Sequence, residues 1–195
     1  MNRFFCFYTI RTAYAAEAER CAKSFAKFGL TVNTVSMLNK RDWMANCMAR
    51  ASVLQKLSCE YPDDGIGLLD SDLTCMQDPI ILKDFVGDIA VHDGGPASPP
   101  QMQYSAGVLI FGATPDGRSC LDLWTKLCHD DKTPTYELRE QLYLKQAIEH
   151  TDALITHVGD AYNKHIDKYR PGDDTVILHH VASRKLKKTI KEDAA

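Results

Sequence analysis

The sequence lacks the features that mark several classes of protein. None of its apolar runs approaches the length of a transmembrane helix, and no Cys-x-x-Cys pair occurs among its seven cysteines. The cysteines are scattered and odd in number, which argues against a disulfide framework or a zinc ribbon and favours reduced thiols. The apolar run at the N-terminus is too short for a signal peptide and resembles a first strand. We therefore expect a soluble, cytoplasmic protein with no membrane span.

The chain also lacks an excess of charge of either sign. Lysine and arginine together number 23, against 26 aspartates and glutamates, which leaves a net charge of -3. This balance argues against general binding to nucleic acid or to an anionic membrane surface. There is no internal repeat, coiled coil or domain linker either, so the 195 residues, 45% of them hydrophobic, fit one globular domain with a substantial core.

What the sequence does have is an alternation of short apolar runs with amphipathic segments, which is typical of α/β domains. Strands are predicted over residues 4–9, 30–35, 65–69, 88–92, 106–111, 153–157 and 175–179. Helices are predicted over residues 14–28, 41–60, 115–129 and 137–150, with a short helical turn opening at Asp78-Pro79. The segment 93–100 has loop or lid composition. This order predicts a single three-layer α/β/α domain with a mostly parallel mixed sheet over residues 1–195, with a basic tail from about residue 184.

A short uncharged run that begins at Gly65 ends in two aspartates one residue apart. The run predicts a buried strand, and ligands of open α/β sheets bind beyond the carboxyl ends of such strands. Residues i and i+2 of an extended segment point the same way, so Asp70 and Asp72 are expected to face one ion. Two carboxylates with room for water and phosphate suit Mg²⁺ or Mn²⁺ bound together with a nucleotide. An Asp-x-Asp triplet alone is a weak signal, but its position after a buried strand favours a functional site over a solvated turn.

A second candidate group lies near the C-terminus, where His179 ends a predicted strand and Lys185 follows six residues later. Neutral imidazole can bind a metal, and a lysine at this distance can reach the phosphates of the same ligand. A His-His pair by itself is more often structural, and the tail lysines by themselves indicate a solvated basic face. Combined with Asp72, they favour a site in which a metal and Lys185 neutralise a departing diphosphate.

These motifs resemble those of the nucleotide-sugar glycosyltransferases of the GT-A fold, most closely glycosyltransferase family 8, the group of glycogenin and bacterial galactosyltransferases. The triplet after the strand and the spacing from His179 to Lys185 match the metal and phosphate motifs of that group. Further loose matches follow in the same order along nearly the whole chain: Thr9 and Tyr14, Ser24-Phe25, Tyr104-Ser105-Ala106-Gly107-Val108, Glu140-Gln141 and Tyr162-Asn163.

The resemblance implies a metal-dependent hexosyltransferase that moves a sugar from a nucleoside-diphosphate donor, expected to be a UDP-sugar, to a glycan, lipid-linked sugar or protein acceptor. It implies that Mn²⁺ or Mg²⁺ is held by Asp70, Asp72 and His179. The residues expected to contact the nucleotide sugar are Thr9, Tyr14, Arg50, Asp70, Ser71, Ser105, Ala106 and Lys185. The candidates for catalytic roles are Gln141, Asp93 and Lys185.

Some of these assignments have plain structural alternatives. Tyr14 is either a base-stacking ring or a core aromatic, Asp93 a sugar-binding residue or an ordinary loop aspartate, and Gln141 a residue beneath the sugar or a polar helix N-terminus. Departures from the family pattern also leave the donor sugar open, because Ser105 and Ala106 replace an asparagine and a serine. The remaining departures are Glu140 for aspartate, Ala182 for glycine, and Arg50 as the nearest basic residue where the family has a lysine.

Two other functions compete with a glycosyltransferase. The run from Leu68 to Thr74 also fits the haloacid-dehalogenase phosphatase pattern, in which Asp70 would be a nucleophile and Asp72 an acid/base. That pattern normally follows the first strand of its fold, whereas here a predicted β-α-β-α unit precedes it. The second competitor is a sugar-nucleotide or glycan-binding module without turnover, a reading supported by the altered residues Ser105 and Ala106.

Overall fold

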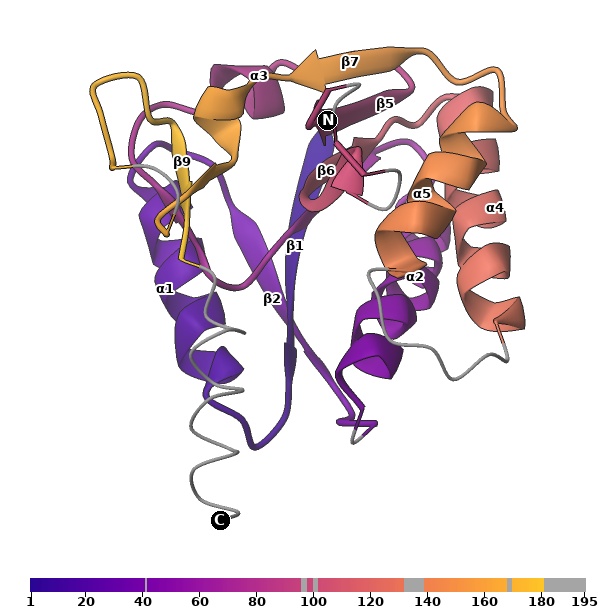
Figure 1. Cartoon of the computed structure of the whole chain (residues 1–195), viewed down its shortest axis with the longest axis horizontal. Helices are drawn as coiled ribbons and strands as arrows, with labels where there is room; N and C mark the ends of the chain where they lie inside the picture. The colour runs from indigo at the N-terminus through magenta and orange to yellow at the C-terminus, as the bar shows by residue number, and fades with distance from the viewer. Residues whose placement is uncertain (41, 96–97, 100–101, 132–138, 168–169, 181–195) are drawn as a thin grey trace.

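A six-stranded sheet forms the centre of the molecule (Figure 1). The structure is a computed structural model that describes residues 1–40, 42–95, 98–99, 102–131, 139–167 and 170–180. The strands of the sheet are β1 (Asn2–Thr9), β2 (Val32–Met37), β3 (Gly65–Leu69), β5 (Ile89–Asp93), β6 (Tyr104–Phe111) and β7 (Ile155–Val158), in the order β2-β1-β3-β6-β5-β7. All neighbouring strands pair in parallel except β6, which runs antiparallel to β3 and β5. The predicted α/β fold with a mostly parallel mixed sheet is confirmed.

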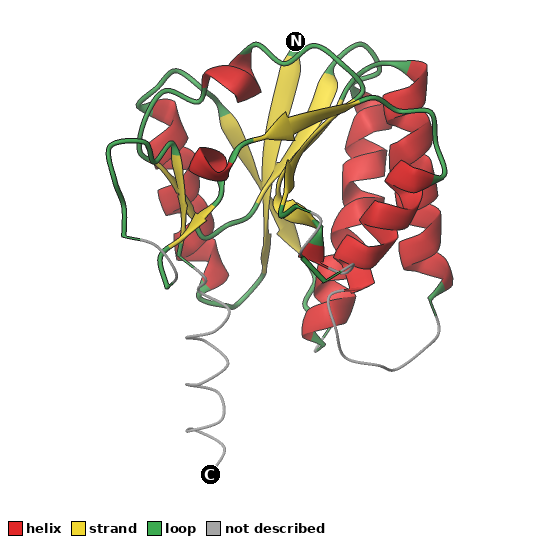
Figure 2. Ribbon diagram, turned by 45° about the horizontal axis from the view of Figure 1, so that its top comes forward, coloured by secondary structure: helices red, strands yellow, loops and turns green. Residues whose placement is uncertain are grey.

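Helices cover both faces of this sheet, as the views in Figures 1 and 2 show. The helices are α1 (Tyr14–Ala26), α2 (Trp43–Glu60), the short α3 (Ile80–Lys83), α4 (Pro115–Asp130) and α5 (Arg139–Glu149). Successive side chains of a strand point to opposite faces. In β1, Phe4 and Cys6 accordingly pack with residues of α1, whereas Phe5 and Phe7 pack with residues of α2, α4 and α5. The two resulting cores hold the central strands from both sides, which is why β1 and β3 read as continuous apolar runs.

A second, three-stranded sheet lies on the α1 side and was not predicted. It contains β4 (Leu73–Cys75), β9 (Ile177–His179) and β8 (Lys164–His165), in the order β4-β9-β8. Strand β4 follows β3 after a three-residue turn and pairs antiparallel with β9, and a single 3-10 turn, η2 (Asp160–Tyr162), precedes β8. Strands of two or three residues are too short to show an alternating pattern in the sequence.

The remaining differences from the sequence prediction concern element ends and undescribed segments. The helix predicted over residues 14–28 ends at Ala26, and Gly29, at φ 76°, lies in the left-handed region that favours glycine after a helix. Residues 41 and 137, parts of the segment 93–100 and the basic tail from residue 184 lie outside the described residues. No helix in the described part of the chain combines the length and the apolar character that a membrane span requires.

Candidate active site

The two aspartates of the triplet lie in the tight turn between β3 and β4. The backbone N–H of Asp70 donates to the carbonyl of Gly107 in β6 (2.9 Å), and the N–H of Leu73 donates back to the carbonyl of Asp70 (3.3 Å). The chain therefore turns at Asp70, Ser71 and Asp72 instead of continuing as a strand. The sequence argument expected the two carboxylates to face one point because of the alternation of an extended segment, whereas the structure brings them together in a turn.

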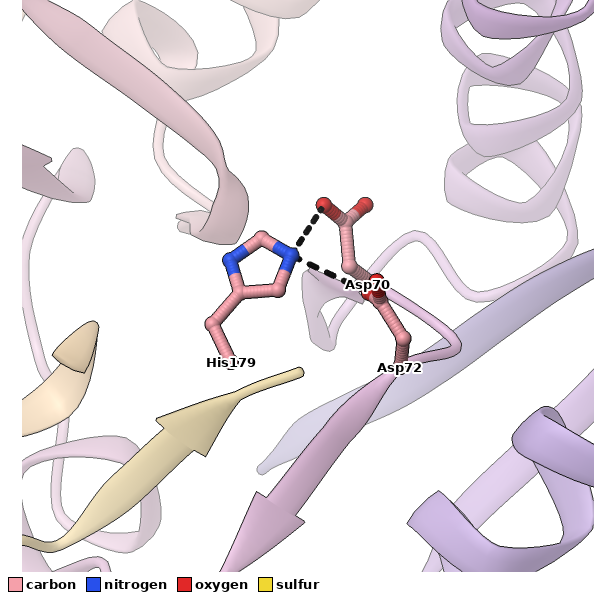
Figure 3. A group of neighbouring side chains, drawn as sticks. All are labelled: Asp70, Asp72 and His179. Atoms are coloured by element: carbon pink, nitrogen blue, oxygen red, sulfur yellow. Dashed lines mark ion pairs between the residues drawn. The ribbon is translucent and has the colours of Figure 1, made fainter. Parts of the chain in front are cut away.

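The small sheet brings His179 to these aspartates. Its pairing places Leu73 of β4 opposite His179 of β9, and the N–H of His180 donates to the carbonyl of Asp72 (3.0 Å). The Nε2 atom of His179 lies 3.0 Å from Oδ1 of Asp72 and 3.7 Å from Oδ2 of Asp70 (Figure 3). One ligand atom from each residue lies within 4.8 Å of the others, so a single cation fits among all three.

The charges around this group favour a cation. Asp72 and His179 are buried, and Asp70 is half-buried. Burial alone lowers the pKa of His179, but the hydrogen bond to Asp72 and the negative charges of Asp72 and Asp70 outweigh it, so the pKa is raised. Burial, together with the same two carboxylates, raises the pKa of the Tyr14 phenol to about 12. Tyr14 therefore lies close to the aspartates and remains a neutral phenol at physiological pH.

Helix α2 contributes Arg50, which connects Asp70 to the buried Glu140 of α5. The guanidinium of Arg50 donates to both carboxylate oxygens of Glu140, at 3.1 Å from Nε and 2.7 Å from Nη2, and its Nη1 donates to Oδ1 of Asp70. Burial opposes the charge of Arg50, but the carboxylates of Glu140 and Asp70 outweigh it and raise its pKa. Arg50 thus occupies one oxygen of Asp70, while the other, Oδ2, faces His179.

A cavity of about 730 Å³ opens over these residues. Its size is in the range of small-molecule sites, which run from about 300 to 1,000 Å³. Nine of the residues predicted from the sequence line it: Thr9, Tyr14, Arg50, Asp70, Ser71, Asp72, Ser105, Gln141 and His179. The fold therefore brings together residues from both ends and the middle of the chain, at the carboxyl ends of β1 and β3.

Two of the predicted residues do not line the cavity, and a third is not among the described residues. Ala106 is fully buried and packs in the core on the α2 side of the sheet. The carboxylate of Asp93 accepts from the N–H of Gly95 (2.8 Å) and lies 3.5 Å from Nδ1 of His157. Lys185 lies outside the described residues. The roles predicted for these three residues stay predictions.

Several cavity residues were given no role in the sequence analysis. The polar ones lie in β5, in η2 and β8 and the residue between them, and in the loop before β9. They include His92, Asp160, Asn163, Lys164, His165 and Asp174. The larger apolar ones include Met37, Trp43, Met44 and Met102. For Asn163 a signal existed, because the Tyr162-Asn163 pair belongs to the motifs of the resemblance; for the others no local pattern marks them.

Comparisons with known proteins bear on the fold. A scan against protein-family models found no match, and neither did a search of curated proteins. Among solved structures, a glycosyltransferase involved in the glycosylation of the major capsid of PBCV-1 matches with a TM-score of 0.68 and 15% identity, over 97% of this chain and 99% of that one.

Two larger proteins match in the same way. The glycosyltransferase GlyE of Streptococcus pneumoniae TIGR4 has a TM-score of 0.64 and 16% identity, over 93% of this chain and 55% of that one. The bifunctional glycosyltransferase WbbM has a TM-score of 0.60 and 11% identity, over 92% of this chain and 45% of that one. This chain spans about half the length of these two proteins. At such low identity the likeness concerns the fold alone: the chain has the fold of GT-A-type glycosyltransferases.

Proposed function

We propose that the protein is a metal-dependent glycosyltransferase, a hexosyltransferase related to family 8, that uses a nucleoside-diphosphate sugar, with UDP as the nucleotide. The observation that supports this most directly is the group formed by Asp70, Asp72 and His179. It lies at the carboxyl end of β3, beneath a cavity of about 730 Å³, in a chain with a glycosyltransferase fold. Ligands of open α/β sheets bind at this end of the strands.

The donor atoms at this group fit a divalent cation. Two carboxylate oxygens and one imidazole nitrogen converge within 4.8 Å, and carboxylate-rich sites suit Mn²⁺ or Mg²⁺. A cation held by Asp70, Asp72 and His179 would stabilise the negative charge that develops on the leaving diphosphate. Arg50 positions Asp70 for this purpose, because it binds Oδ1 and leaves Oδ2 turned toward His179.

Several other residues are assigned to contacts with the nucleotide-sugar donor. Thr9 ends β1 and Tyr14 begins α1, and these two residues would bind the base and ribose, with the Tyr14 ring stacking on the base. Ser71 and Ser105 lie beside the metal group and would contact ribose and sugar hydroxyls. We assign the face beneath the donor sugar to Gln141. On the resemblance alone, we assign Lys185 to the phosphates and Asp93 to the sugar hydroxyls.

The competing functions are less well supported. A haloacid-dehalogenase phosphatase places its nucleophile after the first strand of its fold, whereas Asp70 follows β3, the third strand along the chain, and β3 pairs antiparallel with β6. In addition, Oδ1 of Asp70 is bound by Arg50, which weakens a carboxylate as a nucleophile. A binding module without turnover has the same cavity, so only an assay of donor hydrolysis separates it from an enzyme.

The proposal is tested by removing one carboxylate. In calorimetry with UDP and Mn²⁺, Asp72→Asn should abolish measurable binding, and donor hydrolysis should fall by about 10²–10³-fold, the effect typical of losing one electrostatic contact to a transition state. Asp63→Asn is the matched control, because this aspartate is exposed and lies at the opposite end of β3. Unchanged affinity for UDP with Mn²⁺ in Asp72→Asn would refute the assignment. A screen of UDP-, GDP- and TDP-sugars then identifies the donor.

A further inference from the structure

A chain of hydrogen bonds leads from the surface to His179. The exposed carboxylate of Asp160 contacts Nε2 of His92 through Oδ1 (3.0 Å), and Nδ1 of His92 contacts Nδ2 of Asn163 (3.3 Å). The carboxamide oxygen of Asn163 contacts Nδ1 of His179 (3.3 Å). Asp160 is 89% exposed at its side chain, whereas Asn163 and His179 are buried, at 6% and 9% exposure. This chain of hydrogen bonds therefore runs inward from solvent to Nδ1 of His179, whereas the other ring nitrogen, Nε2, faces the aspartates.

The donors and acceptors along this chain can be assigned in one consistent way. The Nδ2 group of Asn163 can only donate, so Nδ1 of His92 accepts and the proton of a neutral His92 lies on Nε2, from where it donates to Asp160. At the other end the carboxamide oxygen can only accept, so Nδ1 of His179 carries a proton and donates. Nε2 of His179 then faces Asp72 and Asp70 (Figure 3): it donates to Asp72 while it carries a proton, and it binds a cation once that proton is lost.

Both middle members of the chain are held by the fold. His92 lies where the pairing of β5 with β6 shifts register between Val91 and His92, an irregularity that redirects a side chain toward the cavity. Asn163 directly follows η2, where its N–H donates to the carbonyl of Asp160 (3.1 Å). The neighbouring Tyr162 is buried, and its hydroxyl accepts from the N–H of Ile81 in α3 (3.1 Å). The carboxamide of Asn163 therefore has a fixed position between two histidines.

We propose that Asn163, oriented by His92, is a positioning residue that fixes the tautomer and the ring orientation of His179 and so presents Nε2 to a divalent cation. This rests on the proposed function only in taking His179 as a metal ligand. Outer hydrogen bonds of this kind orient metal-binding histidines, and their loss commonly costs about 10–100-fold in metal affinity. No local sequence pattern links these residues, since His92 and Asn163 are 71 positions apart.

The experiment compares substitutions that break the chain at different points. Asn163→Leu keeps the size of the side chain but can neither accept nor donate, whereas Asn163→Asp still accepts from Nδ1 of His179. The dissociation constant for Mn²⁺ is measured by electron paramagnetic resonance without nucleotide. We expect an increase of about 10–100-fold in Asn163→Leu, a smaller one in His92→Phe, and near-native binding in Asn163→Asp. Asn33→Leu, on the exposed side of β2, is the control.

A second readout is independent of metal and of activity. In the metal-free wild-type protein at mildly acidic pH, where both ring nitrogens of His179 carry protons, the Nδ1–H should show the ¹H and ¹⁵N shifts of a hydrogen-bonded proton, and Asn163→Leu should lose them. A wild-type Nδ1–H without these shifts overturns the inference, as does a folded Asn163→Leu with native Mn²⁺ affinity. If that variant does not fold, native affinity in His92→Phe does the same. Absence of Mn²⁺ binding by the wild-type protein would contradict the proposed function, while the ring shifts still decide the role of Asn163.

Discussion

Asp70 divides its two carboxylate oxygens between the arginine that orients it and the site that it serves. Oδ1 accepts from Arg50, and Oδ2 faces His179. Arg50 is itself anchored by a two-point contact with Glu140, which is 4% exposed. Two-point pairing with a guanidinium is geometrically demanding. The Glu140 carboxylate therefore acts on the group of Asp70, Asp72 and His179 indirectly, through Arg50.

Removing Arg50 should leave this buried carboxylate unpaired. We expect Arg50→Met to lose about 3–5 kcal/mol of unfolding free energy, since breaking one partner of a buried ion pair leaves an uncompensated charge. The double variant Arg50→Met/Glu140→Leu should recover much of that loss while still lacking donor binding. Urea denaturation measures both values. Lys23→Met is the control, because it breaks only an exposed pair with Glu19 and should change stability little. A single variant as stable as wild type would contradict the prediction.

His179 makes the stability of the metal-free protein depend on pH. Its folded pKa is raised above the ordinary value of 6.5 by Asp72 and Asp70 against the opposing effect of burial. A raised histidine pKa stabilises the fold fully below the unfolded pKa, and this stabilisation is lost as pH rises through the folded pKa. Thermal melts of the metal-free protein should show this decline above pH 6.5 in wild type and not in His179→Gln. Mn²⁺ affinity should rise over the same interval, because the cation competes with the proton.

Strand alternation explains why Ala106, which was expected to contact the nucleotide sugar, packs in the core instead. Ser105 and Ala106 are adjacent in β6, so their side chains must point to opposite faces of the sheet. Ser105 lines the cavity and Ala106 packs in the core. The alternation rule could have separated the two from sequence alone. It could not have found Arg50 and Glu140 as a pair, because 90 positions lie between them and neither helix carries a local signal for the other.

At the scale of secondary-structure elements, the pairing of β4 with β9 creates the site. This pairing places His179 opposite Leu73, next to Asp72. The strand β3 and the two aspartates could be predicted because both are local features of five to eight residues. The partner strand could not, because β4 and β9 have three residues each and their pairing spans more than a hundred positions. Before the structure, His179 was connected to the aspartates only by the metal-binding chemistry of its side chain and by the resemblance to family 8, not by any predicted strand pairing.

Two glycines in neighbouring strands leave room for different purposes. A Cβ atom on Gly67 of β3 would lie 2.5 Å from the Phe4 ring, whereas one on Gly107 of β6 would lie 3.2 Å from Oδ2 of Asp70 and 3.5 Å from Cε1 of His179. The missing side chain of Gly67 leaves room for the buried ring of Phe4, which belongs to the core. The missing side chain of Gly107 leaves room for Asp70 and His179.

Alanine at these two glycines should therefore have separable effects. Gly67→Ala should cost about 1–3 kcal/mol of stability, the usual range for overpacking a core, with little change in Mn²⁺ affinity. Gly107→Ala should leave stability closer to wild type but weaken Mn²⁺ binding by about tenfold, comparable to disturbing an outer contact of a metal site. Urea denaturation and Mn²⁺ titration on both variants give the comparison. Equal Mn²⁺ affinities in the two variants would show that Gly107 does not bound the site.

At the scale of the whole molecule, the cavity collects residues from most elements of the described chain. β1 contributes Thr9, α1 Tyr14, α2 Arg50, the β3–β4 turn the aspartates, and β9 His179. A ligand that bridges these elements contacts both cores at once. It binds the folded chain and has no comparable site in the unfolded one, so its binding energy adds to global stability.

The chain should therefore be stabilised markedly by UDP and Mn²⁺ together. At a ligand concentration of about 100 times the dissociation constant, linkage adds about 2.7 kcal/mol. For a chain of 195 residues this corresponds to a rise in melting temperature of about 5–11 °C. Either component alone should give less, because the carboxylates repel the diphosphate unless a cation lies between them. Differential scanning calorimetry measures the shift, and EDTA should reverse it. A shift that survives EDTA, or persists in Asp72→Asn, would mean that the nucleotide binds without the acidic pair.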